Sequence, residues 1–299
     1  MKKIMILLII IVISVGAFAD ELYKPYILGA KSTLPMTDVI ENLKINLQNN
    51  RLEVVGEYTP AKDEDRYVVV ITSEELKSIV NDLGGLKGFL SSLRIGIIAN
   101  NGVYEISYVN PSYQAMAYLQ NDYDQMKSLI NELEQKLQNS MQGFETVVMQ
   151  PFGSEKGLTE KKLKKYKYMM AMPRFDNVVE LAEFESYEKT LEVINKNLEA
   201  SQSSSKVYQI DFPEQKLTLI GIGLSGDQGE EKFLPIIDIS EPHHTAFLPY
   251  EMLILDNKAV MLHGRYRIAL SFPDLTMGTF MKIMSTPGEI EDAMKALTK

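Results

Sequence analysis

One half of this chain repeats the pattern of the other half. Residues 102–111 align without a gap with residues 264–273, and the two segments share Gly, Tyr, Ile and Pro at matching places. An amphipathic helix expected to end at Leu47 has a counterpart expected to end at Leu198. Repetition over such a distance predicts two similar lobes with a ligand site between them.

Each copy is expected to combine β-hairpins with amphipathic helices. The turn Asn100-Asn101-Gly102 joins two strand-like runs, and Asn-Gly favours the positive φ angles of a tight hairpin. We therefore predict an α+β protein of two similar lobes, each a curved, mainly antiparallel sheet with helices packed on one face. The predicted boundaries are residues 20–137 for the first lobe, 138–177 for a linker and 178–299 for the second lobe.

One short segment carries a family resemblance. The run from Asn110 to Tyr118, in which Asn-Pro ends a strand and a Tyr- and Ala-containing segment follows, resembles the bacterial domain of unknown function 302 family. Phe272-Pro273-Asp274-Leu275 is a more distant match in the second copy. The resemblance implies tandem copies over residues 25–137 and 178–297, each a small α+β sandwich with a curved antiparallel sheet. It implies no activity and no catalytic residue.

The N-terminus has the pattern of a secretory signal peptide. Two lysines precede an apolar run over residues 4–15, and Ala17-Phe18-Ala19 supplies the small residues of a cleavage site. The apolar run is shorter than the roughly 20 residues that cross a bilayer. We expect residues 1–19 to be removed after Ala19, leaving a soluble periplasmic or secreted protein with no transmembrane span.

Charge and cysteine content exclude several classes of partner. Cleavage removes two of 31 basic residues and none of 40 acidic ones, which changes the net charge from −9 to −11. Such an acidic protein repels phosphates, so no nucleic-acid partner is expected. The absence of cysteine excludes disulfides, thiolate metal sites and a cysteine nucleophile.

The linker segment is basic and rich in methionine and tyrosine. Its lysines are Lys156, Lys161, Lys162, Lys164, Lys165 and Lys167. One interpretation is a solvated linker helix whose apolar end docks onto a lobe. The other is a basic surface that meets an anionic partner or lipid headgroups.

Two arginines in the second copy suggest an anion site. Residues 265–271 are expected to form a strand, on which Arg265 and Arg267 project from the same face and could grip an anion with two guanidinium groups. With Tyr166 and Tyr168 of the linker they form the predicted site for a small anionic ligand. The alternative is a pair of surface arginines bridged to nearby carboxylates.

Methionine is the second unusual feature of the composition. Met169, Met170 and Met172, with His263, offer thioether and imidazole ligands that suit Cu(I) in an exported protein. Core packing is the competing interpretation for methionines at helical spacing, as at 277, 281 and 284. The pair His243-His244 is expected in an exposed loop with no function.

No catalytic motif is convincing. The G-x-G-x-x-G match at 221–226 is followed by acidic residues and no helix start, so it does not indicate a dinucleotide site. No serine stands in a nucleophile-elbow context. We expect a two-lobed, exported binding or interaction protein, with no cofactor and no enzyme activity, whose partner is a small anion or a protein. The alternative is a periplasmic copper-handling protein.

Overall fold

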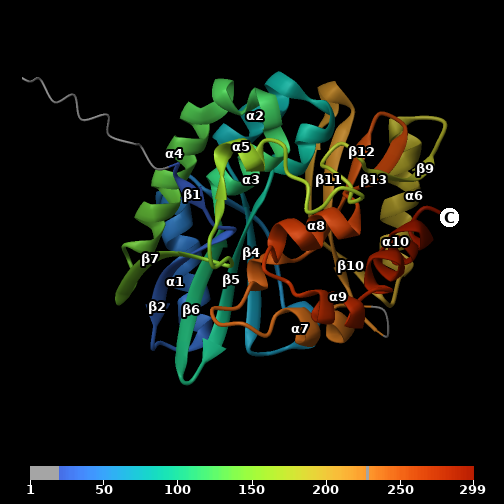
Figure 1. Ribbon diagram of the computed structural model, residues 1–299. Helices are drawn as coiled ribbons and strands as arrows, with labels where there is room; N and C mark the ends of the chain where they lie inside the picture. Colours follow the sequence, from blue (N-terminus) through green and yellow to red (C-terminus); the bar gives the residue numbers. More distant parts are fainter. Residues whose placement is uncertain (1–19, 227–228) are drawn as a thin grey trace, which may run out of the picture.

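The computed structural model describes residues 20–226 and 229–299 (Figure 1). The expected signal peptide, residues 1–19, lies outside the described residues. The predicted α+β class is confirmed: antiparallel sheets are packed against helices. Within the described ranges, no helix is both long enough and apolar enough to span a membrane.

The first half of the chain forms a six-stranded antiparallel sheet of order β3-β4-β5-β6-β2-β7. Its elements are β2 (Tyr26–Ser32), α1 (Met36–Asn49), β3 (Glu53–Tyr58), β4 (Arg66–Thr72), α2 (Glu74–Leu83), β5 (Leu93–Asn100), β6 (Val103–Val109), α3 (Pro111–Leu119), α4 (Tyr123–Met141) and β7 (Thr146–Phe152). The expected helical stripe of α1, Val39, Leu43 and Leu47, is fully buried.

The second half forms a five-stranded antiparallel sheet of order β10-β11-β12-β13-β9. Its elements are β9 (Val179–Glu183), α6 (Tyr187–Ala200), β10 (Ser204–Phe212), β11 (Leu217–Leu224), α7 (Glu230–Ile237), β12 (Tyr250–Leu255), β13 (Lys258–Met261), α8 (Gly264–Ser271), α9 (Met277–Lys282) and α10 (Thr286–Ala296).

The two halves share one topology. Both halves have the same order of elements: strand, helix, strand, strand, helix, strand, strand and helix. In each half the first strand of this series pairs with the last strand, β2 with β6 and β9 with β13. A register shift interrupts both of these pairs, and another interrupts both β3–β4 and β10–β11. The repeated sequence pattern therefore corresponds to a repeated order of elements.

The alignment of residues 102–111 with 264–273 is nevertheless wrong. Residues 103–109 are strand β6, whereas 264–271 are helix α8, which occupies the place of α3 in the repeat. Both helices begin at a capped residue: Asn110 accepts a hydrogen bond from a backbone N–H at the start of α3, and the His263 ring does so at the start of α8. The shared residues of the two segments hold different positions in the fold.

The halves pack into each other. Figure 1 shows the first half, blue to green, beside the second, yellow to red. The short 3₁₀ helix η2 (Gly85–Leu90) of the first half packs on β11 and β12, and η5 (Thr245–Phe247) of the second half packs on β4, β5 and β6. A Cβ atom on Gly96 of β5 would lie 2.9 Å from the backbone nitrogen of Ala246. This exchange of equivalent segments joins the two interiors into one apolar core.

Strands β3 and β10, which are edge strands of their respective sheets, also contact each other. A Cβ atom on Gly56 of β3 would lie 2.3 Å from the backbone oxygen of Val207 in β10. Only glycine allows this approach, so the two sheets adjoin along strands that hold the same position in each half.

The segment expected as a linker, residues 138–177, is instead part of the folded body. Its first residues complete α4, and 146–152 form β7, which pairs with β2. The following residues, 153–177, form a strap in which β8 (Leu158–Thr159) pairs with β1 (Leu22–Tyr23), before the four-residue helix α5 (Glu160–Leu163). The interpretation as a solvated linker helix is therefore wrong.

Candidate functional site

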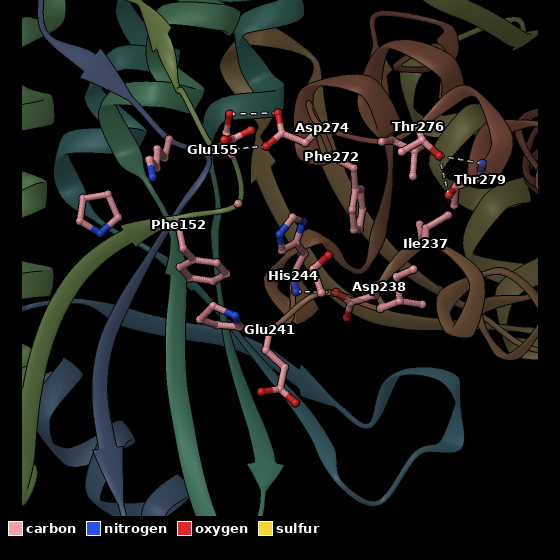
Figure 2. Close-up of a pocket in the computed structure, with 18 of the residues that line it drawn as sticks. Phe152, Glu155, Ile237, Asp238, Glu241, His244, Phe272, Asp274, Thr276 and Thr279 are labelled. Carbon is pink, nitrogen blue, oxygen red and sulfur yellow. Dashed lines mark hydrogen bonds between the residues drawn. The ribbon is translucent and has the colours of Figure 1, made fainter.

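A cavity of about 390 Å³, called the cleft below, lies between the two halves (Figure 2). It is walled by the end of β7 and the first residues of the strap, by the loop that follows α7, and by the segment between α8 and α9. Residues from both halves and from the strap thus meet in one cavity. The most distinctive of them are Phe152, Asp238, His244, Phe272 and Asp274.

His244 is held in the cleft wall by aromatic rings. Its ring stacks on Phe272 with centroids 4.6 Å apart, and the centroids of Tyr26 and Phe152 lie at 4.8 and 5.7 Å. The Nδ1 atom lies 3.1 Å from the backbone oxygen of Ser271. These contacts come from both halves and fix the orientation of the imidazole.

The hydrogen bond at Nδ1 determines what the other ring nitrogen can do. A carbonyl oxygen only accepts hydrogen bonds, so Nδ1 carries the proton and Nε2 keeps a free lone pair. Burial lowers the pKa of His244 to about 4, and the ring is therefore neutral near pH 7. Nε2 makes no hydrogen bond within residues 20–226 and 229–299, so it is available as an acceptor.

Gly153 keeps the space beside Nε2 open. Its φ angle is +91°, and a Cβ atom there would lie 3.3 Å from Nε2 of His244 and 2.8 Å from the Tyr26 ring. Any side chain at this position would be strained and would crowd the imidazole. The glycine therefore preserves access to His244.

The loop that carries His244 is anchored by Asp238. Its carboxylate accepts a hydrogen bond of 2.7 Å from the backbone N–H of His244, and it pairs with Arg66 of β4 in the first half. Burial alone would raise the pKa of Asp238, but His243 and Arg66 hold it below its usual value. The hydrogen bond to Asp238 in turn raises the pKa of His243. This network fixes the loop to the opposite half.

Acidic side chains surround the cleft. Glu155 and Glu241 are exposed at its rim, and Asp274 accepts hydrogen bonds from the Ser154 hydroxyl and the Glu155 backbone. Lys24 is the lysine among the residues that line it. The balance of charge favours a neutral or cationic ligand over an anion.

The structure does not bring the predicted anion site together. Arg265 is exposed on α8, whereas Arg267 is 3% exposed and lies 2.8 Å from the Glu251 carboxylate. Residues two apart on a helix do not share a face, so the paired grip of an anion is wrong. Tyr166 is buried and donates to the backbone oxygen of Ala269 at 2.7 Å, and Tyr168 is 41% exposed.

The predicted copper ligands are only partly gathered. Met169 and Met172 line a small cavity of about 50 Å³ together with Met277 and Arg265. Met170 is 92% exposed and His263 caps α8, and neither lines that cavity. Among the described residues, no group of three or more His, Cys, Asp or Glu side chains is placed to hold a metal ion. The methionines at 277, 281 and 284 are exposed, so their interpretation as core residues is wrong.

His244 is the residue that the sequence interpretation missed. The sequence predicts an exposed imidazole, whereas only 7% of the surface of His244 is accessible. One signal in the sequence could have indicated that His244 is buried. The apolar run Ala246-Phe247-Leu248 begins two residues after it, and at most 1% of the surface of each of these three residues is exposed.

No protein-family model matches the chain, and no curated protein matches its sequence. One solved structure is similar, that of an uncharacterised conserved protein of the DUF302 group from Bacillus stearothermophilus. The identity is 16%, the TM-score is 0.33, and the match covers 38% of this chain and 93% of the other. The chain is thus similar to this protein over part of its length, and the match does not show two copies.

Proposed function

We propose that this protein binds a small molecule in the cleft, and that Nε2 of His244 accepts a hydrogen bond from that molecule. The observation that carries the proposal is a buried, neutral imidazole with an unused acceptor, set among aromatic rings. The volume of the cleft lies within the range of small-ligand sites. An oriented acceptor beside apolar rings supplies specificity together with binding energy.

The ligand we expect is neutral or cationic and carries an N–H or O–H donor next to a flat apolar part. The acidic rim disfavours the small anion expected from the arginine pair. Because each half inserts a short helix into the other, we expect the cleft to keep its shape when the ligand binds.

Ligand-observed NMR tests this function. We would screen neutral and cationic heteroaromatic compounds, with carboxylates of matched size as anionic members. His244→Phe keeps the aromatic stacking and removes the acceptor. This variant should therefore not bind the compounds that bind to the wild-type protein. His263→Asn, outside the cleft, is the matched control. Equal binding by wild type and His244→Phe would refute the role of Nε2.

The tautomer of His244 can be checked without any ligand. Imidazole ¹⁵N chemical shifts distinguish a protonated Nδ1 from a protonated Nε2. We expect the Nδ1–H form near pH 7. A protonated Nε2 would remove the acceptor from the cleft and contradict the proposal.

A second candidate function is Cu(I) binding, favoured by the cavity that Met169, Met172 and Met277 share. Three thioethers are suitable Cu(I) ligands. Competition for Cu(I) against a chromogenic chelator tests it: the triple Met→Leu variant at these positions should lose affinity, whereas Met284→Leu should not. Equal affinities would exclude this cavity as the copper site.

We also propose that the chain arose by tandem duplication of a unit like the domain of unknown function 302, and that it is exported after cleavage at Ala19. The shared order of elements and of strands supports the first proposal. Mass spectrometry of protein from the native organism tests the second: a mature N-terminus at Asp20 is expected, and an intact Met1 in all of the protein would contradict it.

A further inference from the structure

A buried charge cluster lies where the two halves meet. Arg94 of β5 and Arg267 of α8 both pair with the carboxylate of Glu251 in β12, at 2.9 and 2.8 Å. At most 4% of the surface of any of these residues is exposed. Two guanidinium groups sharing one carboxylate leave one positive charge without a partner.

The groups that hydrogen-bond to the cluster are neutral and do not supply the missing charge. Tyr208 and Ser92 donate hydrogen bonds to Glu251, and both are neutral. Backbone oxygens, including that of Phe247, accept from Arg267. The buried carboxylate of Asp238 is already paired with Arg66. That of Glu230 accepts hydrogen bonds from Tyr58 and Ala61 and makes no ion pair with either arginine of the cluster. A charge left uncompensated in a protein interior is strongly unfavourable, so a compensating anion is expected.

A small cavity of about 20 Å³ lies beside Arg94. Gln114 lines it and is 2% exposed, and its Oε1 atom accepts a hydrogen bond from Arg94 at 3.2 Å. That bond fixes the orientation of the amide, so Nε2 is the donor, and it has no hydrogen-bond partner among the residues that the structure describes. Other residues with hydroxyl groups also line the cavity, namely Tyr26, Tyr113, Tyr118 and Ser271.

We propose that this cavity binds a single monoatomic anion of the size of chloride. The cavity has room for one particle of about the size of a water molecule. Guanidinium and amide N–H groups on its wall are donors, which an anion satisfies and a cation does not. The anion neutralises the Arg94–Glu251–Arg267 cluster and thereby joins the two halves. This site is separate from the cleft and does not depend on the function proposed for it.

Thermal unfolding in two salts provides the first test. Gluconate is too large for the cavity, so sodium chloride and sodium gluconate at equal ionic strength differ in whether their anion can enter it. We expect the melting temperature of the wild-type protein to be higher in chloride and to rise further with the logarithm of its concentration. Bromide should act similarly. Equal melting temperatures in chloride and gluconate would show that the cavity holds water only and would overturn the proposal.

The variant Gln114→Glu locates the effect. A carboxylate at this position supplies the missing negative charge, so the variant should be insensitive to chloride and at least as stable in gluconate as the wild type. Gln135→Glu, on the exposed face of α4, is the matched control and should keep the chloride response. A chloride response that persists unchanged in Gln114→Glu would place the anion elsewhere.

³⁵Cl line broadening measures binding directly and does not rely on unfolding. The wild type should broaden the chloride signal more than Gln114→Glu does at the same protein concentration. Equal broadening would refute this location for the anion. If Gln114→Glu does not fold, the comparison of salts on the wild-type protein still decides whether chloride binds.

Discussion

Glu230 offers a sharp test of the contact between the two halves. It is the first residue of α7 and 1% exposed, and its carboxylate accepts hydrogen bonds of 3.0 Å from the Tyr58 hydroxyl and from the Ala61 backbone of the first half. These donors are neutral. Burial consequently dominates and raises the pKa of Glu230 from 4.5 to about 7.

The pKa of Glu230 fixes the sign of its effect on stability. Between pH 4.5 and 7 the folded protein holds a proton that the unfolded chain has lost, so the free energy of unfolding falls as the pH rises. The shift corresponds to about 3 kcal/mol across this window. His244 acts in the opposite direction: its pKa falls from 6.5 to about 4, so its contribution to the free energy of unfolding rises over that range by about 3 kcal/mol. In the wild type the two effects largely cancel.

Glu230→Gln removes one of the two opposing effects. Urea unfolding of wild type and variant at several pH values gives both stability profiles. We expect the difference in free energy of unfolding, variant minus wild type, to increase by about 3 kcal/mol between pH 4.5 and pH 7. Carboxylates other than Glu230 contribute equally to both proteins and drop out of the difference. Glu231→Gln, at the partly exposed neighbour that pairs with Lys62, should leave the shape of the profile unchanged. Parallel profiles for wild type and Glu230→Gln would refute the reasoning.

Three further substitutions test the packing between segments that are distant in the sequence. Gly56→Ala forces a methyl group against the backbone of Val207 and should lower the free energy of unfolding by about 1–3 kcal/mol in urea titrations. Glu251→Gln leaves the two buried arginines without their carboxylate and should cost about 3–5 kcal/mol, measured in the same way. Tyr166→Phe removes the hydrogen bond from the strap to Ala269 and should cost about 1 kcal/mol, visible as a lower melting temperature; an unchanged value would show that this bond contributes nothing.

Regular periodicity allowed much of the fold to be predicted. Helix α1 has one buried stripe, and the hairpin at Asn100-Asn101-Gly102 has a turn of distinctive composition; both are where the sequence places them. Helix α8 is different because every residue from Tyr266 to Leu270 is buried. A helix buried on all sides has no polar face and therefore lacks the helical period of apolar residues. The alternation of arginine with apolar residues over 265–268 instead predicts a strand.

The candidate site was less predictable because it depends on contacts between distant parts of the chain. His244 is buried by rings from β2, β7 and the end of α8, and nothing in its immediate sequence names these partners. Arg267 was expected at the surface, but its charge is paired with Glu251, 16 residues earlier in the chain. Pairing of this kind allows an arginine to be buried, and local sequence does not reveal it.

The cleft lies where the two halves differ. Strand β7 adds a sixth strand to the first sheet, and the five-stranded second sheet has no counterpart to it. The loop from α7 to β12 carries His243 and His244, whereas the equivalent connection from α2 to β5 contains η2 and no histidine. The features common to both halves, namely the strand order and the exchanged 3₁₀ helices, hold the two sheets together. The features unique to one half converge on the cleft, so a repeated scaffold carries one asymmetric cavity, which is the arrangement expected for the binding function proposed above.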